Sequence, residues 1–259
     1  MMNARIPVIV IDDTPIKRRG VCDFVAETPR LELGGQAGNS AEAIGFVEGV
    51  LAQTQHASLA GWLVLCDLRL GDENGIELGR SLLELAPGLK IVIYTQDPSW
   101  TLAAEVFRQE YTRRGRARPP GTRTGTPSGL HGYTLFGHLE PFYLERMSTI
   151  LMEQQQPFID AEVLAHLLKR LHGQRLTPRQ EECAALLASG LSNDEIAVQM
   201  GFLTAKGGPN LGPLENLVGE LYRFFAIRGA PGDPSRRVLL AYAYEAYAGL
   251  RKDPRSAPE

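Results

Sequence analysis

Three short apolar runs in the first hundred residues each end in a polar side chain, and helical stretches separate them. The runs are 6–11, 62–66 and 89–94, and the residues that follow are Asp12 and Asp13, Asp67, and Thr95. Short apolar runs that alternate with helical segments are typical of a parallel α/β sheet. Ligands bind such sheets at the carboxyl ends of the strands. The four side chains are therefore predicted to converge on one small acidic pocket.

The chemistry of that pocket follows from its charges. Three carboxylates repel one another unless a cation lies among them, and oxygen ligands suit Mg²⁺, which keeps part of its water shell. A carboxylate beside bound Mg²⁺ can attack a phosphoryl donor, because the metal neutralises charge on the phosphoryl oxygens. A hydroxyl at the next strand end can then bind the phosphoryl group. The alternative is that the acids only solvate the ends of the strands.

With these motifs, roughly residues 5–155 resemble the receiver domain of two-component response regulators. The resemblance implies a doubly wound five-stranded parallel sheet, with the stretch 132–136 as its fifth strand. It also implies Mg²⁺ as cofactor, and a histidine kinase or another phosphoryl donor as partner. The implied site consists of metal ligands Asp12, Asp13, Asp67 and the Arg69 backbone carbonyl, the phospho-acceptor Asp67, and the switch residues Thr95 and Tyr133.

The chain departs from the receiver pattern at one position of the site. In the family, a lysine three residues after the switch aromatic binds the phosphoryl oxygen, whereas this chain has Phe136 there. No lysine occurs between Lys90 and Lys169. Two interpretations follow. In the first, Asp67 still accepts a phosphoryl group, either with one cationic partner fewer or with an arginine in place of the lysine. In the second, the phosphate switch of this receiver fold has weakened or gone.

A second departure is an insertion between Thr95 and Phe136, which fits the segment 110–128. The segment has almost no apolar content, so it cannot bury enough surface to order itself. Its basic residues are Arg113, Arg114, Arg116, Arg118 and Arg123. We expect a flexible basic loop on a surface that receivers use for dimers and partners. Such a loop can bind phosphate backbones or acidic protein faces, or it can be a solvated loop without a partner.

Length and composition limit the remaining possibilities. A chain of 259 residues is long enough for two domains, and 44% apolar residues support buried cores. The net charge of −3 gives no overall sign of nucleic-acid binding. We expect a cytoplasmic protein, because no stretch approaches the ~20 apolar residues of a membrane span and no signal peptide pattern is present. Cys22, Cys66 and Cys183 lack metal or redox spacing and are predicted to be buried thiols.

The second half of the chain is predicted to be helical. An amphipathic segment, 161–171, follows Asp160. Thr177 with Gln180, and Ser192 with Glu195, then form two capping boxes that open short helices. A short helix pair with a tight glycine turn fits the front of a helix-turn-helix.

On the residues 176–181 and 190–197, this stretch resembles the LuxR/NarL-type DNA-binding domain. The predicted organisation is therefore a receiver domain (1–155), a helical linker (156–175), a small all-α helix-turn-helix domain (176–250) and a flexible tail (251–259). The final helix is expected at 236–247.

The recognition helix departs from the family. The turn before it, 202–213, is about six residues too long and contains three glycines and two prolines. The helix expected at 214–223 carries Glu215 and Glu220 where a DNA reader carries cations. Because neutralising phosphates supplies most non-specific affinity for DNA, acids there weaken binding. The remaining candidates for phosphate contact are Lys206, Arg223, Arg228, Arg236 and Arg237.

Two functions remain open. The first is an atypical response regulator that binds DNA, as a homodimer, under control of Asp67. The second is a protein-interaction regulator that has kept both folds but lost sequence-specific DNA binding. An enzyme is not expected, because no pair of nucleophile and base and no nucleotide loop occurs outside the Asp67 pocket.

Overall fold

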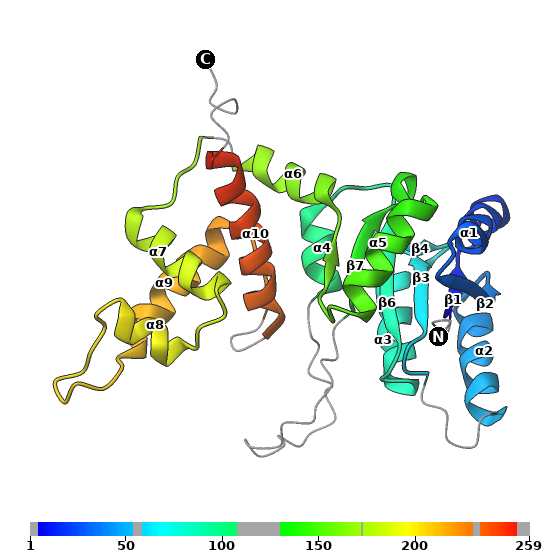
Figure 1. Ribbon diagram of the computed structural model, residues 1–259, viewed down its shortest axis with the longest axis horizontal. Coiled ribbons are helices and arrows are strands. Elements are labelled where there is room, and N and C mark those ends of the chain that lie inside the picture. Colours follow the sequence, from blue (N-terminus) through cyan, green and yellow to red (C-terminus); the bar gives the residue numbers. More distant parts are fainter. Residues whose placement is uncertain (1–4, 54–58, 108–129, 172, 230–233, 253–259) are drawn as a thin grey trace. The chain divides into compact units, whose positions relative to one another are not determined.

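The computed structural model describes residues 5–53, 59–107, 130–171, 173–229 and 234–252 (Figure 1). Contacts divide the chain into two compact units. The first comprises Met1–Pro98 and Glu110–Asp160, and the second comprises Ser99–Gln109 and Ala161–Glu259. The basic segment predicted at 110–128 and the last seven residues of the predicted tail lie outside the described residues. In the described part of the chain, no helix is both long and apolar enough to cross a membrane.

The first unit is built on a parallel sheet with the strand order β2-β1-β3-β6-β7-β8. Its strands are β1 (Ile6–Ile11), β2 (Leu31–Ala37), β3 (Leu63–Asp67), β6 (Lys90–Thr95), β7 (Gly132–Leu135) and β8 (Phe158–Ile159). The predicted doubly wound parallel sheet is confirmed. It has six strands instead of the predicted five, because the two-residue strand β8 adds to the edge of β7. A short hairpin, β4 (Arg69–Leu70) with β5 (Glu73–Asn74), follows β3.

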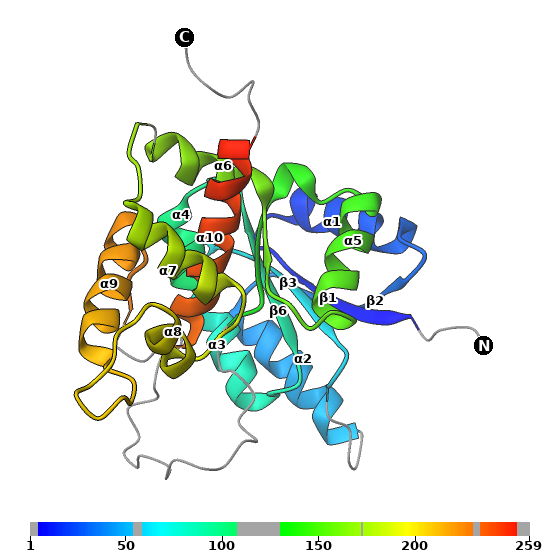
Figure 2. The same ribbon diagram turned by 60° about the vertical axis from the view of Figure 1, so that its left-hand side comes forward.

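Helices cover both faces of this sheet (Figure 2). Helices α1 (Pro15–Glu27) and α5 (Pro141–Met152) bury residues such as Val25 and Met147 against one face. Helices α2 (Ser40–Gln53) and α3 (Gly75–Leu85) pack on the other. Burial on both faces explains why the central strands read as continuous apolar runs.

The register of the sheet places the polar ends of the strands together. Ile11 pairs with Cys66, Asp67 pairs with Tyr94, and Thr95 pairs with Leu135. The residues that follow β1 therefore lie next to the last residues of β3 and β6. This edge of the sheet is the carboxyl edge, where an α/β fold binds ligands.

Strand β8 is tied to the rest of the first unit by Asp160, the residue after it. The Asp160 side chain is fully buried and accepts hydrogen bonds from the Thr134 hydroxyl at 3.0 Å and the Tyr143 hydroxyl at 2.6 Å. It also accepts from the Leu135 N–H and lies 2.9 Å from His138 Nδ1. Since a buried carboxylate is tolerated when it is well hydrogen-bonded, Asp160 fixes the end of β8 against β7.

The second unit is helical. It contains α4 (Trp100–Val106), α6 (Ala161–Arg170), α7 (Pro178–Ala188), α8 (Asn193–Gln199), α9 (Leu211–Phe224) and α10 (Pro234–Lys252). Both predicted capping boxes are present, at the starts of α7 and α8. Gly190 and Gly201 follow these helices with φ of 86° and 73°, a left-handed conformation that glycine adopts without strain. The Trp100 indole N–H donates to the Phe225 carbonyl at 2.8 Å.

The turn between α8 and α9 is long, as predicted. Its two sides meet at a bridge between Leu203 and Pro209, and Gly207 turns the chain with φ of 79°. Helix α9 begins at Leu211, three residues before the predicted start, so that expectation was wrong. Pro213 lies in the first turn of the helix, where its missing N–H breaks no helical hydrogen bond. Helix α10 also extends beyond the predicted 236–247 at both ends.

Candidate phospho-acceptor site

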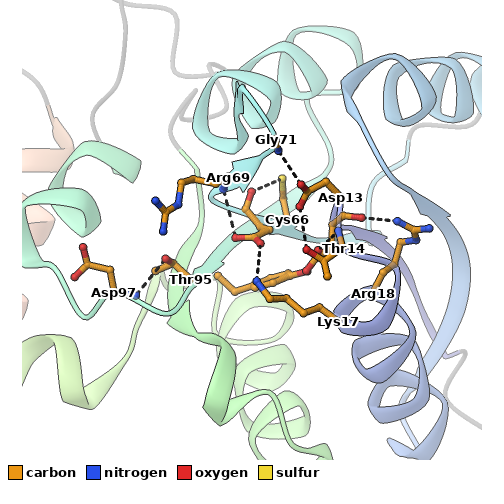
Figure 3. Close-up of polar contacts among 12 residues, drawn as sticks. Asp13, Thr14, Lys17, Arg18, Cys66, Arg69, Gly71, Thr95 and Asp97 are labelled. Atoms are coloured by element: carbon orange, nitrogen blue, oxygen red, sulfur yellow. Dashed lines mark hydrogen bonds and ion pairs between the residues drawn. The ribbon is translucent and has the colours of Figure 1, made fainter.

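Three carboxylates meet at the carboxyl edge of the sheet. Asp12, Asp13 and Asp67 each offer one oxygen, and these oxygens lie within 4.8 Å of one another. Figure 3 shows the polar contacts around Asp13 and Lys17 at this place. Asp12 is fully buried, Asp67 is 8% exposed, and Asp13 is exposed. Asp13 and Asp67 border a cleft of about 330 Å³ whose lining also includes Thr95 and Phe136. The structure thus brings together the four side chains that the sequence placed after three different strands.

Backbone and side-chain donors hold the acidic pair. The Thr14 N–H donates to Asp12 Oδ1 at 2.7 Å, and the Tyr94 hydroxyl donates to Asp12 Oδ2 at 2.7 Å. The Gly71 N–H donates to Asp13 Oδ2 at 2.9 Å. Burial, together with the Asp12 carboxylate, raises the pKa of Tyr94, so this hydroxyl keeps its proton and acts as a donor.

Burial and the nearby donors shift the pKa of the Asp67 carboxyl in opposite directions. Burial is the main cause that raises the pKa of the Asp67 carboxyl, and the Asp12 charge raises it further. The Arg69 N–H, 3.3 Å from Asp67 Oδ1, and the Lys17 ammonium, 3.8 Å from Asp67 Oδ2, lower the pKa in part. The chain after Asp67 turns so tightly that a Cβ on Gly75 would lie 2.0 Å from the Asp67 carbonyl oxygen. Glycine is therefore required at position 75, where α3 begins beside Asp67.

Thr95 and Tyr133 meet at a common backbone segment. Thr95 is 5% exposed, and its hydroxyl oxygen accepts from the Asp97 N–H at 3.2 Å. The ring of Tyr133 is fully buried, and its hydroxyl donates to the Asp97 carbonyl at 2.7 Å. The two candidate switch residues come from adjacent strands and both bind the residue that follows β6 by two positions.

Phe136 begins a 3₁₀ turn, η1 (Phe136–His138), directly after β7. Its half-buried ring lies 6.1 Å from the Tyr94 ring, measured between centroids. The ammonium of Lys17, on the first turn of α1, lies 5.7 Å from the centroid of the Phe136 ring. Sequence reasoning missed Lys17, because it searched for a cation only near position 136. The signal was its place one turn after Thr14, where the start of α1 faces the acidic pair.

Comparisons with known proteins show what the chain is similar to. No family model matches the chain. The chain is 29% identical over 204 residues to the DNA-binding transcriptional activator DevR/DosR of Mycobacterium tuberculosis, covering 78% of this chain and 82% of that protein. It is 26% identical over 198 residues to the nitrate/nitrite response regulator protein NarL of Escherichia coli, covering 73% and 78%. The chain is similar to response regulators of the NarL/LuxR type.

Solved structures of response regulators are also similar to it. The RcsB response regulator of Salmonella typhimurium aligns with a TM-score of 0.47 and 19% sequence identity, over 93% of this chain and 98% of that chain. The response regulator ChrA of a heme-sensing two-component system aligns with a TM-score of 0.39 and 17% identity, over 94% and 100%.

The candidate DNA contacts in the helical unit fall into two groups. Lys206, Arg223 and Arg228 are exposed. Arg236 instead stacks over the Tyr222 ring, with its guanidinium carbon 3.8 Å from the ring centroid. Arg237 donates to Asn193 Oδ1 at 2.7 Å and to the Leu191 carbonyl. The contacts of Arg236 and Arg237 tie α10 to other parts of the same unit.

The acidic residues of α9 also differ in their surroundings. Glu215 is exposed, whereas Glu220 Oε2 accepts from the Gln180 side-chain amide at 3.0 Å. Both acids are exposed, but Glu220 also links α9 to α7 through this hydrogen bond.

Proposed function

We propose that this response regulator is a signal-dependent transcriptional regulator that binds DNA and uses Asp67 as its phospho-acceptor. The observation that carries the proposal is the cluster of three carboxylates whose oxygens lie within 4.8 Å beside the Thr95 hydroxyl. The relative from M. tuberculosis, named a DNA-binding transcriptional activator, supports the DNA-binding part.

The donor set at the site fits Mg²⁺. Asp12, Asp13, Asp67 and the Arg69 backbone carbonyl are hard oxygen ligands, and a cleft at one side leaves space for water. A bound Mg²⁺ would neutralise charge on the phosphoryl oxygens as the group is transferred. The hydrogen bonds from Thr14 and Gly71 orient the acidic pair without using all of its oxygen lone pairs.

The remaining residues of the site receive the phosphoryl group. A carboxylate oxygen of Asp67 attacks the phosphorus of the donor, the donor's leaving group departs with the electron pair of its bond to phosphorus, and the Thr95 hydroxyl donates to a phosphoryl oxygen. Thr95 would then turn from its contact with the Asp97 N–H, and Tyr133 holds the other side of Asp97. We propose that this exchange of partners at Asp97 is the first structural response to phosphorylation.

Lys206, Arg223 and Arg228 are the side chains we propose for phosphate contacts with DNA, because they are exposed. Arg236 and Arg237 are left out because they already bind groups within the helical unit. The proposal includes a homodimer as the DNA-bound form and a histidine kinase or small phosphoryl donor as the source of the phosphoryl group.

The test is the selection of bound fragments from genomic DNA by the full-length protein, at two salt concentrations and with or without acetyl phosphate. We expect an enriched sequence whose yield rises with the donor, and no donor effect in Asp67→Asn or in Asp12→Ala with Asp13→Ala. Enrichment that ignores the donor would remove Asp67 from the proposal.

A second candidate function is a protein-interaction regulator that works without sequence-specific DNA binding. It is favoured by the exposed acid Glu215 on α9 and by the engagement of Arg236 and Arg237 within the unit. The basic segment 110–128 is the proposed partner surface in that case. No enriched fragment in any condition would support this function and would contradict the first.

A further inference from the structure

We infer that Lys17, on helix α1, supplies the cation that binds the phosphoryl group on Asp67 in place of the lysine that position 136 lacks. This inference rests on the proposed role of Asp67 as phospho-acceptor. It assigns a catalytic residue that stands far from the expected position in the sequence but on the same cleft.

The position of the Lys17 ammonium fits a phosphoryl oxygen. It lies 3.8 Å from Asp67 Oδ2, which is longer than a direct hydrogen bond. The ammonium therefore faces the cleft beside the carboxylate without being locked onto it. A phosphoryl group bonded to Asp67 would bring its oxygens into this space. The Lys17 side chain is 32% exposed, so it has the freedom to adjust by the small distance that a direct contact needs.

Phe136 complements a lysine that arrives from α1. The Lys17 ammonium lies 5.7 Å from the centroid of the Phe136 ring, within the range of a cation–π contact. A lysine at position 136 would bring a second ammonium close to the first, and like charges at that distance repel. Phe136 removes this repulsion and offers the face of a ring instead. The two residues are consistent with one paired change at the site.

Tyr94 supports the same arrangement. Its hydroxyl donates to Asp12 Oδ2 at 2.7 Å, and its ring lies beside that of Phe136. This neutral donor satisfies an oxygen of the buried Asp12 carboxylate without a cation. Lys17 is therefore left to serve Asp67 alone.

Of the other cations near the site, Arg69 lines the same cleft, whereas Arg18 and Lys90 are directed elsewhere. Arg18 Nη1 donates to the Asp12 backbone carbonyl, and Arg18 Nε donates to Gln36. In the view of Figure 3 the guanidinium of Arg69 points away from the Lys17 ammonium and from the acidic pair. Lys90 is the first residue of β6, at the opposite edge of the sheet. Of the described cations, Lys17 is the one whose charge lies against Asp67.

The transfer step that Lys17 would assist is balanced without a proton. An Asp67 oxygen forms a bond to the phosphorus of an acyl phosphate, and the bond from phosphorus to the carboxylate leaving group breaks, with the electron pair going to that carboxylate. The Lys17 ammonium keeps its proton and donates a hydrogen bond to a phosphoryl oxygen. It offsets charge that builds up on that oxygen in the transition state.

The test follows phosphorylation of the full-length protein by acetyl phosphate and Mg²⁺, with the covalent adduct measured by intact mass. Lys17→Met should lower the initial rate about tenfold, the size expected for one charge-assisted hydrogen bond in the transition state. Arg19→Met, which removes a positive charge from an exposed position of the same helix, should leave the rate unchanged. Lys17→Arg should keep much of the rate because it keeps the charge.

A rescue variant separates this role from a merely structural one. Lys17→Met combined with Phe136→Lys restores a cation at the family position, and we expect the rate to recover. Binding of beryllium fluoride, a phosphoryl mimic, followed by ¹⁹F NMR, should weaken in Lys17→Met and recover in the double variant. If Lys17→Met does not fold, Lys17→Gln serves as the second variant.

The outcomes distinguish this inference from the proposed function. Equal rates for the wild type and Lys17→Met would overturn the assignment of Lys17 and leave Asp67 as acceptor. A wild-type protein that gains no more mass than Asp67→Asn would overturn the acceptor itself, and the role of Lys17 with it.

Discussion

At the scale of single residues, the two buried carboxylates of the site differ in their hydrogen bonds, which are short for Asp12 and long for Asp67. Asp12 receives two hydrogen bonds of 2.7 Å, whereas the hydrogen bond from the Arg69 N–H to the Asp67 side chain is 3.3 Å long. Hydrogen bonds stabilise a carboxylate charge and draw electron density from its oxygens. The weakly hydrogen-bonded Asp67 thus suits the proposed role of nucleophile better than Asp12, and the well-fixed Asp12 suits the proposed role of metal ligand.

The raised pKa of Asp67 has a consequence for stability. Because the carboxyl is more basic in the folded protein than in the unfolded chain, its charge destabilises the fold above the folded-state pKa. Without Mg²⁺, Asp67→Asn should raise the free energy of unfolding by about 1 kcal/mol at neutral pH. The gain should shrink as the pH falls through that pKa, since both side chains are then neutral.

Urea unfolding of the wild type and Asp67→Asn, from neutral pH to below the pKa of Asp67, measures the difference in the free energy of unfolding. Asp72→Asn is the control, because it neutralises an exposed acid close to the site and should change the free energy by less than about 0.5 kcal/mol. A gain for Asp67→Asn that stays constant at every pH would show that the charge is not its cause.

At this scale, the sequence alone predicted some residues of the candidate site and missed others. Asp12, Asp67 and Thr95 were found because each follows an apolar run, and the strand register then brings them together. Lys17 and Tyr94 were missed. Their contributions depend on which face of a helix or strand they occupy and on how far a long side chain reaches, and no run or motif encodes that.

At the scale of elements, the close approach of the start of α3 to the end of β3 fixes the backbone position of Asp67. Gly75 lies where a Cβ would be 2.0 Å from the Asp67 carbonyl oxygen. Gly75→Ala must therefore displace the backbone of Asp67, and we expect a loss of about 2 kcal/mol in the free energy of unfolding. The affinity for Mg²⁺ should fall as well, because the displaced residue is one of the proposed ligands.

A matched substitution gives the opposite sign. Gly45, in the middle of α2, is exposed, and a methyl group added there would meet no atom within 4 Å, so Gly45→Ala should stabilise the fold by about 0.5–1 kcal/mol. Thermal unfolding and Mg²⁺ titration of the two variants check both statements. Equal effects of the two alanines would mean that the junction has room to relax.

Elements with strong end signals were predictable, and those without them were not. The capping boxes at Thr177 and Ser192 fix the starts of α7 and α8, and the structure confirms both. The start of α9 was placed too late because Pro213 was taken to precede the helix, although a first turn tolerates proline. The two residues of β8 are too few to show an alternating pattern.

At the scale of the whole molecule, charge is the property that bears on DNA binding. A net charge of −3 offers no general attraction, so affinity depends on where individual charges lie. Glu215, exposed on α9, opposes the phosphate contacts proposed for Arg223. Glu215→Lys should strengthen non-specific DNA binding roughly fivefold at low salt.

Fluorescence anisotropy with a DNA duplex at several salt concentrations measures this change. Glu48→Lys, which makes the same charge change at an exposed position of α2, should leave the affinity within about twofold. The steeper salt dependence expected for Glu215→Lys would reflect one further phosphate contact. Equal gains in DNA affinity for the two variants would show that the change in net charge is the cause, and not the position of residue 215 on α9.

The buried Asp160 and strand β8 bear on how such regulators exchange parts during evolution or in engineered fusions. A junction placed at the predicted boundary, after residue 155, would remove β8 and the carboxylate that binds Thr134 and Tyr143. The unpaired edge of β7 would then be open to association with other chains. We therefore expect the sheet domain to be transferable only when the junction follows Asp160, because the segment after residue 155 contributes its last strand.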